Sequence, residues 1–383
     1  MRITDVCAFY TPHGGGVRTY IEQKLAYAPT AGHDLTVIAP GPEAGVDERG
    51  PHARIVYLKS PRLIVDRKYG YFNNQAKLFA ALDAARPDVV EVSSPWRSAS
   101  EVGRWPGTAP RFLIMHSDPL SAFAYRWFRP LFSRATIDRG FEAFWAHLRN
   151  LGAAYDQVIC ANRDLHDRLV AGGIDNCMLS PMGVEPGLFT PANRSVEVRR
   201  DLLALCDLPP EATLLLGVGR LSAEKRWPLV VKAVTHAGRD HPLGLVLLGE
   251  GGQRDRLVRA IAGNPHIRIV QPERDRRNFA RILASADALV HGCEAETYCL
   301  VGAEARASGL PVIVPDRGGA ADHAAEGGGL TYASGDPAAC SAAIEKWLEA
   351  PLRPPPETAR TLPDHFAELF GYYESVLAGR GAA

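Results

Sequence analysis

The sequence has 383 residues, enough for two domains of ordinary size, and its 46% hydrophobic and 22% charged residues are typical of a globular protein with substantial cores. Basic and acidic residues number 43 each, so the overall charge favours neither a nucleic-acid partner nor an acidic one. The seven cysteines are scattered and form no C-x-x-C pair, which argues against a disulfide framework and against a zinc site.

The N-terminal residues already read as a strand, with no signal segment before them, and no apolar run reaches the length of a membrane span. We therefore expect a cytoplasmic protein, with peripheral association at the inner face of the membrane as a further option.

The first half of the chain alternates apolar runs with helical patterns, which predicts a parallel α/β sheet. Strands are expected at 3–9, 34–39, 54–58, 88–92, 112–116, 157–161 and 178–181, and helices at 17–28, 71–85 and 164–171.

Two features of this half lie where parallel sheets bind ligands, beyond the carboxyl ends of their strands. Gly14, Gly15 and Gly16 follow the first strand and allow close approach of a ligand to the backbone, although a plain tight turn is the alternative. They do not form the G-x-G-x-x-G fingerprint, which disfavours an NAD oxidoreductase. His116 ends another strand, where a structural hydrogen bond is the alternative to a functional role.

Residues 121–150 combine five arginines with seven tryptophans and phenylalanines, a pattern typical of an amphipathic helix. Such a helix is typical of an element that binds an anionic membrane surface. The alternative, which we prefer slightly, is an aromatic stripe facing the core with a solvated basic back.

A proline-containing stretch at 186–195 predicts the domain boundary, and the strands LLLGVG, LVLLGEG, IRIVQ, ALVHG and VIVP that follow predict a second doubly wound sheet. The five prolines between 351 and 363 predict an extended linker before a last helix. We expect an N-terminal domain of residues 1–188 plus the crossing helix 364–383, and a C-terminal domain of residues 189–363.

The stretch 289–315 carries the candidate site. A helix at about 299–308, closed by Gly309, is expected to begin after a turn in which Thr297 caps its first amides. The start of such a helix favours an anion, and Glu296 and Glu304 beside it favour hydroxyl groups, as in a nucleotide sugar. Arg220 and Lys225 follow the first strand of the same half and are suited to a diphosphate. Solvated surface charges are the alternative.

Together these motifs resemble the retaining GT-B glycosyltransferases of family 4, which carry a Glu-x7-Glu signature. GGGVRTY, GVGRLSAEK, LLGEGGQRDRL and the stretch around Glu296 and Glu304 occur in the order found in that family. The resemblance implies two Rossmann-like domains facing a central cleft, with the last helix crossing back to the first domain.

The resemblance also implies roles for individual residues. Arg220 and Lys225 would bind the donor diphosphate, Glu304 the ribose and Glu296 the transferred sugar. Further donor contacts are implied for Gly15 and Gly16, for Gln271 near the base, for the helix start at Tyr298, Cys299 and Leu300, and for His116 beside the sugar. The family's usual Gly-Phe-Gly or Pro-Phe-Gly after the first glutamate is here Thr297-Tyr298-Cys299, so the resemblance does not carry the family's sugar preference over to this chain.

The implied reaction is hexose transfer from a nucleoside diphosphate sugar, for which UDP is favoured, with the leaving phosphate taking the acceptor's proton. We expect no metal, since no Asp-x-Asp motif occurs, no cofactor besides the donor, no nucleic acid, and a lipid at the membrane surface as one acceptor. Alternatives that remain open are a non-catalytic protein that binds a sugar nucleotide or a membrane surface, and a GT-B epimerase. The sequence does not indicate an oligomeric state.

Overall fold

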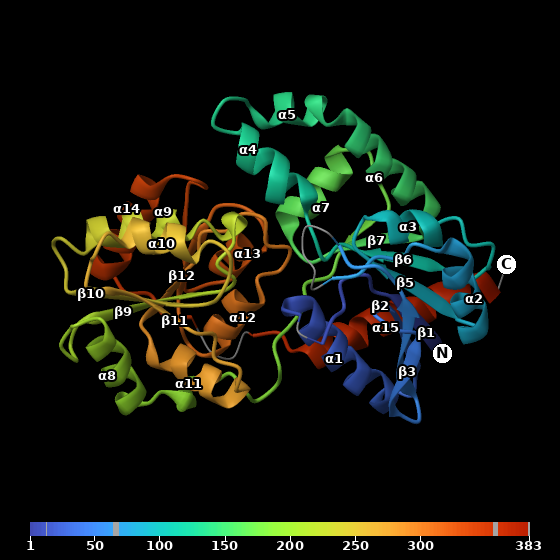
Figure 1. The fold of residues 1–383 in the computed structure, drawn as a ribbon, viewed down its shortest axis with the longest axis horizontal. Helices are drawn as coiled ribbons and strands as arrows, with labels where there is room; N and C mark the ends of the chain where they lie inside the picture. The colour runs from blue at the N-terminus through green and yellow to red at the C-terminus, as the bar shows by residue number, and fades with distance from the viewer. Residues whose placement is uncertain (13, 64–68, 355–358, 382–383) are drawn as a thin grey trace. The chain divides into compact units, whose positions relative to one another are not determined.

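The apolar runs of the sequence lie in two separate β-sheets (Figure 1). The computed structural model describes residues 1–12, 14–63, 69–354 and 359–381. It divides into a first unit, Met1–Ser117 with Phe132–Met182 and Leu362–Ala383, and a second unit, Asp118–Leu131 with Gly183–Thr361.

The sheet of the first unit has the strand order β3-β4-β2-β1-β5-β6-β7-β8. Its strands are β1 (Arg2–Val6), β2 (Asp34–Gly41), β3 (Gly45–Gly50), β4 (Ala53–Lys59), β5 (Val89–Ser93), β6 (Arg111–Ile114), β7 (Gln157–Cys160) and β8 (Cys177–Leu179). All neighbours are parallel except β3, which pairs antiparallel with β4. In the centre of the sheet, Val6 lies opposite Ile38 on one side and Val92 on the other.

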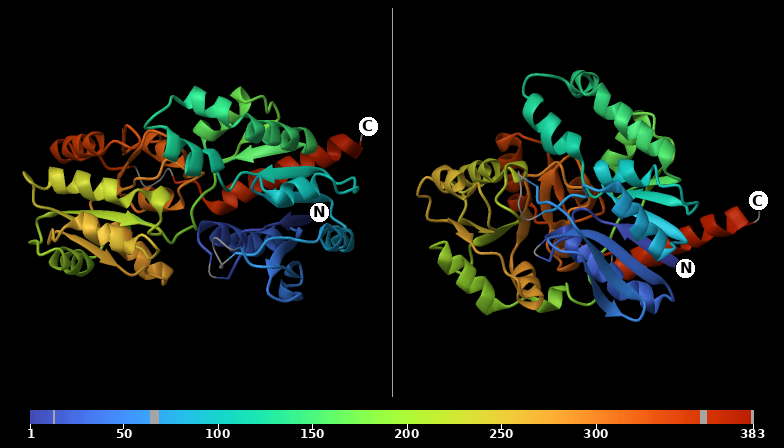
Figure 2. Two further views of the ribbon diagram at one scale, coloured as in Figure 1. Left: turned by 45° about the horizontal axis from the view of Figure 1, so that its top comes forward. Right: turned by 45° about the vertical axis from the view of Figure 1, so that its right-hand side comes forward.

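The sheet of the second unit is parallel throughout and has the order β11-β10-β9-β12-β13-β14. Its strands are β9 (Thr213–Val218), β10 (Leu243–Leu248), β11 (Ile267–Val270), β12 (Ala288–Val290), β13 (Val312–Pro315) and β14 (Leu330–Tyr332). Helices cover both faces of this sheet, α9, α10 and α14 on one and α8 and α11 on the other (Figures 1 and 2). The predicted architecture of two doubly wound parallel sheets is confirmed.

The α-helices are α1 (Gly16–Thr30), α2 (Gln75–Ala85), α3 (Arg97–Val102), α4 (Arg126–Phe128), α5 (Arg134–Gly140), α6 (Glu142–Ala154), α7 (Arg163–Ala171), α8 (Val196–Leu205), α9 (Trp227–Ala237), α10 (Arg254–Ile261), α11 (Arg276–Ser285), α12 (Leu300–Ala307), α13 (Gly319–Ala325), α14 (Pro337–Glu349) and α15 (Leu362–Gly381). A π-helical turn η1 (Leu120–Tyr125) and two 3-10 turns, η2 (Pro191–Asn193) and η3 (Ala223–Lys225), complete the elements. Side chains cap several helices by accepting a backbone N–H, which satisfies amides that have no partner within the helix; these caps are Asn74, Ser133, Asn162, Ser195, Asp275 and Asp336.

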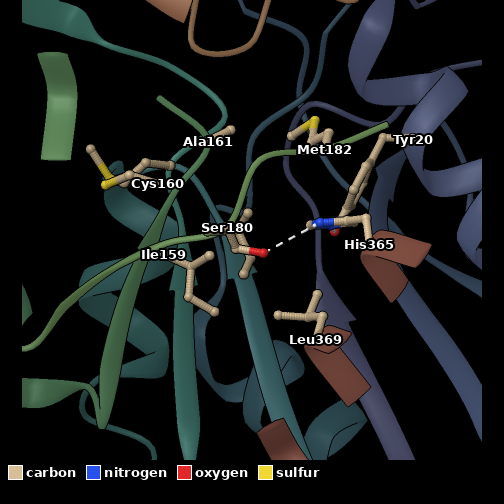
Figure 3. Close-up of a pocket in the computed structure, with 10 residues that line it drawn as sticks. Tyr20, Ile159, Cys160, Ala161, Ser180, Met182, His365 and Leu369 are labelled. Atoms are coloured by element: carbon tan, nitrogen blue, oxygen red, sulfur yellow. Dashed lines mark hydrogen bonds between the residues drawn. The ribbon is translucent and has the colours of Figure 1, made fainter. Parts of the chain in front are cut away.

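Helix α15 completes the first unit. Phe366 and Phe370 pack against Tyr27 of α1, and the Tyr373 ring lies 4.2 Å from that of Phe112 on β6. His365 reaches from this helix to Ser180, at 3.3 Å (Figure 3). The cavity beside that contact measures about 10 Å³, so it accommodates at most a single water molecule and is no ligand site. Residues 355–358 of the predicted proline-rich linker before α15 lie outside the described residues.

A buried charge cluster lies at the centre of the first unit. Lys24 of α1 contacts Asp5 of β1, with 2.9 Å between Nζ and Oδ2, and also Glu91 of β5. All three side chains are at most 1% exposed. Buried charges of this kind persist only when they are paired, so the lysine links the helix to the two central strands.

The segment Asp118–Leu131, which we call the aromatic segment, belongs to the second unit although the residues on both sides of it belong to the first. Four of its large apolar side chains are exposed, namely Phe123, Trp127, Phe128 and Leu131, as is Phe132 directly after it, whereas Leu120 and Tyr125 are buried. Trp145, further along the predicted 121–150 helix, is 5% exposed and donates its indole N–H to Asp138. The preferred core-facing interpretation is therefore wrong for Trp127, Phe128 and Phe132, whereas it applies to Trp145. The single predicted helix is divided into several shorter ones.

Within the described ranges, no helix has the length and hydropathy needed to cross a membrane.

Candidate active site

The loop between β12 and α12 carries the first acidic residue of the predicted signature. Gly318 and Gly319 pack against this loop, and a Cβ atom on Gly319 would lie 2.6 Å from Cα of Tyr298. The Gly319 amide donates to the Glu296 carbonyl at 2.7 Å. The loop is thus held by backbone contacts that only glycine permits at this separation.

The Glu296 carboxylate meets two donors on one oxygen atom. Lys225, at the end of η3, forms an ion pair with Oε1, and Nε2 of His291 lies 2.9 Å from the same atom. His291 follows β12 directly, and Lys225 follows β9, the neighbouring strand. The carboxyl ends of two adjacent parallel strands therefore bring these side chains together, as expected for such a sheet.

The three groups fix one another's charge states. Burial alone raises the pKa of Glu296, but Lys225 and the hydrogen bond from His291 outweigh it, so the net pKa lies well below its usual value. Burial lowers the pKa of Lys225, yet the Glu296 charge raises it above its usual value overall. Burial lowers the pKa of His291 more than Glu296 raises it. The result is an ionised carboxylate, a charged lysine and a neutral imidazole.

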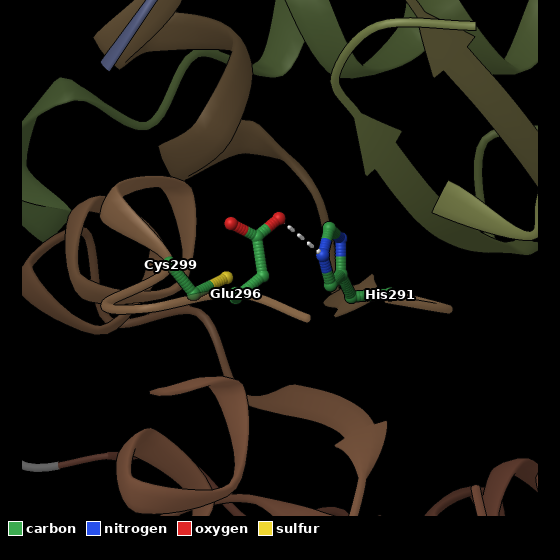
Figure 4. A group of neighbouring side chains, drawn as sticks. All are labelled: His291, Glu296 and Cys299. Atoms are coloured by element: carbon green, nitrogen blue, oxygen red, sulfur yellow. Dashed lines mark hydrogen bonds and ion pairs between the residues drawn. The ribbon is translucent and has the colours of Figure 1, made fainter. Parts of the chain in front are cut away.

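His291, Glu296 and Cys299 form the one group of side chains, among the described residues, whose ligand atoms lie close enough to hold a metal ion, within 4.8 Å of one another (Figure 4). The Lys225 ammonium, however, contacts the same carboxylate. Burial also raises the pKa of the Cys299 thiol well above its usual value, which disfavours the thiolate that a metal requires. We therefore interpret the group as a hydrogen-bonding network.

Helix α12 begins immediately after this network. Its N-cap is Cys299, in the left-handed region with φ +67° and with no side-chain cap bond. The N-cap position therefore lies two residues after Thr297, the residue expected to cap the helix. Gly309 ends the helix with φ +72°, as predicted. Tyr298 is buried with its ring 4.9 Å from that of His323, and Leu300 is the first helical residue.

Glu304 lies on α12 and is nearly buried. Its Oε1 accepts a bond of 2.8 Å from Arg276, the first residue of α11, and Arg276 also stacks on Phe189 with 4.9 Å to the ring centroid. Burial raises the pKa of Glu304, although Arg276 opposes that shift. Gln271 is exposed directly after β11, the strand that precedes α11. Arg276 and Gln271 thus lie at the two ends of the connection between β11 and α11.

Glu294, which the sequence analysis did not select, is nearly buried in the same loop. It accepts a bond of 2.5 Å from Arg226 and one of 3.1 Å from Arg129 of the aromatic segment. Arg226 adopts φ +50° at the start of α9. These contacts attach the aromatic segment to the loop that carries Glu296.

Arg220 lies beyond the end of β9 and is largely exposed, with a contact of 3.3 Å to Glu224. Its carbonyl accepts a hydrogen bond from the Trp227 indole. The backbone is therefore held in place while the guanidinium remains accessible to solvent.

The remaining predicted residues belong to the first unit. Gly15 is the N-cap of α1 and Gly16 its first residue, and a Cβ atom on Gly15 would meet no atom within 4 Å. His116 follows β6, with its ring packed edge-on against Tyr20 at 4.8 Å. Burial lowers the pKa of His116 to about 4, so the imidazole is neutral at physiological pH.

In chemical terms, the second unit presents a fixed cation, an ionised carboxylate and a helix start at one edge of a parallel sheet. Such a combination accommodates an anionic group together with hydroxyl groups. Sequence reasoning missed His291, Arg226, Glu294 and Arg276. The signal for His291 was present, because it ends a strand in the same way as His116.

Two family descriptions match the chain. Residues 207–361 match "Glycosyl transferases group 1" and residues 15–183 match "Glycosyl transferase 4-like domain". A GDP-mannose-dependent alpha-(1-6)-phosphatidylinositol dimannoside mannosyltransferase of Mycobacterium tuberculosis is 31% identical over 322 residues, covering 82% of this chain and 79% of the relative. A GDP-mannose-dependent alpha-mannosyltransferase of Mycolicibacterium smegmatis is 28% identical over 99% of both chains.

Among solved structures, a sucrose-phosphate synthase from Thermosynechococcus elongatus superposes with a TM-score of 0.70 at 21% identity, covering 100% of this chain and 98% of that one. At this identity the likeness supports the fold alone.

Proposed function

The chain belongs to the group 1 glycosyltransferases of family 4, and we propose that it transfers mannose from GDP-mannose to a lipid acceptor with retention of the anomeric configuration. It is a glycosyltransferase of the GT-B fold. GDP-mannose replaces the UDP-sugar favoured from the sequence alone, because the names of several relatives specify GDP-mannose. Those names also specify alpha linkages, and GDP-mannose is itself α-linked, so an alpha product corresponds to retention.

The observation that carries the proposal is the ion pair between Lys225 and Glu296 beside the start of α12. We assign the Glu296 carboxylate to hydroxyl groups of the transferred sugar, and Lys225, Arg220 and the amides that open α12 to the diphosphate. Because its pKa is raised, Lys225 stays protonated at physiological pH. It therefore supplies the fixed positive charge that a departing diphosphate requires.

The proposed reaction forms a bond between the acceptor oxygen and the anomeric carbon on the face that the phosphate leaves. The bond from the anomeric carbon to the phosphate oxygen breaks, and the acceptor's proton passes to the departing phosphate. The residues named here then contribute positioning and charge stabilisation and do not act as a nucleophile. Glu304 is assigned to the ribose, and the connection beginning at Gln271 to the guanine.

Two observations support a lipid acceptor. The Mycobacterium tuberculosis relative is named for a phosphatidylinositol dimannoside acceptor. The aromatic segment exposes Phe123, Trp127, Phe128 and Leu131, and it is joined through Arg129 to the loop that carries Glu296. Exposed aromatic groups of this kind bind at the boundary between lipid headgroups and acyl chains.

The test is release of nucleotide from GDP-mannose, UDP-glucose and ADP-glucose, with and without lipid extract. We expect release from GDP-mannose that lipid stimulates. Replacing Lys225 by Ala should lower turnover by roughly 100-fold or more, the usual effect of removing one preorganised charge-stabilising group. Replacing the exposed Lys232 of α9 by Ala is the matched control and should have no effect. Full activity of the Lys225 variant would contradict the assignment, and no release from any donor would favour a non-catalytic binding protein.

A further inference from the structure

His291 is a fully buried residue that contacts the carboxylate assigned to the transferred sugar. Its backbone is fixed from both directions, because its N–H donates to the Ile313 carbonyl at 3.0 Å and its carbonyl accepts the Tyr332 hydroxyl at 2.6 Å. The Trp227 ring stands edge-on to the imidazole at 5.9 Å. The ring therefore has little freedom to change its direction.

The hydrogen-bonding state of this imidazole follows from its surroundings. Burial keeps it neutral, so it carries a single N–H. The neighbouring carboxylate is ionised and accepts hydrogen bonds only, which places that N–H on Nε2, 2.9 Å from Oε1 of Glu296. Within the described part of the chain, Nδ1 is buried and contacts no hydrogen-bonding partner. His291 thus acts as a donor toward Glu296 and toward no other group.

Both donors to Glu296, Lys225 and His291, bond to Oε1, and no hydrogen bond or ion pair of the described residues reaches Oε2. Figure 4 shows one carboxylate oxygen directed at the His291 ring and the other directed away from it. A carboxylate held through one oxygen by a rigid donor has its plane fixed, so its second oxygen has a defined direction.

We propose that His291 is a positioning residue for sugar selection, which holds one oxygen of Glu296 so that the other meets the hydroxyl groups of the transferred sugar. The inference rests on the proposed function, in that Glu296 must face the donor sugar. It adds a residue that touches no substrate, and it attributes discrimination between epimeric sugars to the fixed direction of Oε2.

Two variants separate positioning from packing. In His291→Gln the amide N–H lies near the position of the native Nε2–H and still reaches Glu296. In His291→Asn the shorter amide places its N–H near Nδ1 and does not reach Glu296. Both replace the ring with a neutral amide, so they serve as controls for each other.

Calorimetry with GDP and GDP-mannose, together with initial rates on GDP-mannose and GDP-glucose, gives the readouts. We expect His291→Asn to bind GDP as the wild type does, but to lose roughly 10- to 100-fold in kcat/KM for GDP-mannose, the usual effect of losing a hydrogen bond to a charged group. Its preference for GDP-mannose over GDP-glucose should fall by a similar factor. His291→Gln should retain most of the wild-type kcat/KM for GDP-mannose and most of the wild-type preference for GDP-mannose over GDP-glucose.

The inference is overturned if His291→Asn keeps the wild-type rate and preference, or if the two variants lose GDP binding and thermal stability alike, which indicates packing. Failure of the proposed function has a different signature, because the wild-type protein itself would then bind no GDP and release none from GDP-mannose. That result would overturn the inference as well.

Discussion

Replacing Lys24 by Met tests the buried charge cluster of the first unit. The apolar stem of the side chain is retained, so little cavity forms, while Asp5 and Glu91 lose their common cation at no more than 1% exposure. Removing one partner of a buried ion pair typically costs about 3–5 kcal/mol. Since whole domains are stable by about 5–15 kcal/mol, the first unit should become marginally stable.

The loss of stability caused by Lys24→Met should depend on pH in a defined direction. Burial raises the pKa of Glu91 from 4.5 to about 7, with Lys24 opposing the shift. The folded protein therefore binds more protons than the unfolded chain between these values, so the contribution of Glu91 to stability decreases as pH rises through this window. Without Lys24 the carboxyl groups retain protons more strongly, so the variant should lose less stability at pH 5.5 than at pH 8.

Hydrogen exchange at increasing urea, followed in peptides from β1 and β5, measures the free energy of unfolding of the first unit locally. A local measurement is needed because a chain with two units need not unfold in a single two-state transition. Glu91→Gln is the matched control. It keeps the one-to-one pair of Lys24 and Asp5, and it should remove most of the pH dependence at a smaller cost. A loss below about 1 kcal/mol at pH 8 for Lys24→Met, or one independent of pH, would show that buried charge is not what holds these elements together.

Two further predictions concern the second unit. Arg276→Leu removes the cation beside Glu304 and should raise the pKa of that carboxyl further. We therefore expect the affinity for GDP, measured by calorimetry, to fall by roughly 10-fold, and to fall more at pH 6 than at pH 8. An unchanged affinity would contradict the assignment of Glu304 to the ribose. Changing Trp127 and Leu131 to Ser should abolish flotation with anionic liposomes, since each loses roughly 1.5–3 kcal/mol of apolar burial. The same change at exposed Val258 of α10 should have no effect, and equal flotation of all variants would argue against membrane contact by the aromatic segment.

Most of the sheet strands could be predicted from the sequence because buried parallel strands are continuous apolar runs. Strand β3 (Gly45–Gly50) was not predicted because its sequence is polar and its residues are mostly exposed. It is held at the edge of the sheet by its pairing with β4. The aromatic segment was misread for a related reason. Whether an aromatic side chain faces a core or solvent depends on distant contacts, here those of Arg129 with Glu294.

In the candidate site, the two glutamates and Lys225 stood out because they follow strands or open a helix in a recognisable motif. Arg276 and Glu294 carry no such signal, since a charged residue in a loop is usually solvated and only the fold shows which ones are buried. Position in the sequence therefore predicts which residues reach the sheet edge, whereas the partners that set their charge and direction become visible only in the structure.

Helix α15 has a consequence for how the protein is synthesised. It is translated only after the second unit, yet it covers Tyr27 and Phe112 in the first unit, which is otherwise translated before residue 183. Throughout translation of the second unit, the first unit therefore presents an uncovered aromatic face. Nascent chains should depend on chaperones at this stage, and a stop codon before Leu362 should yield an aggregation-prone product although every residue assigned to the donor is present.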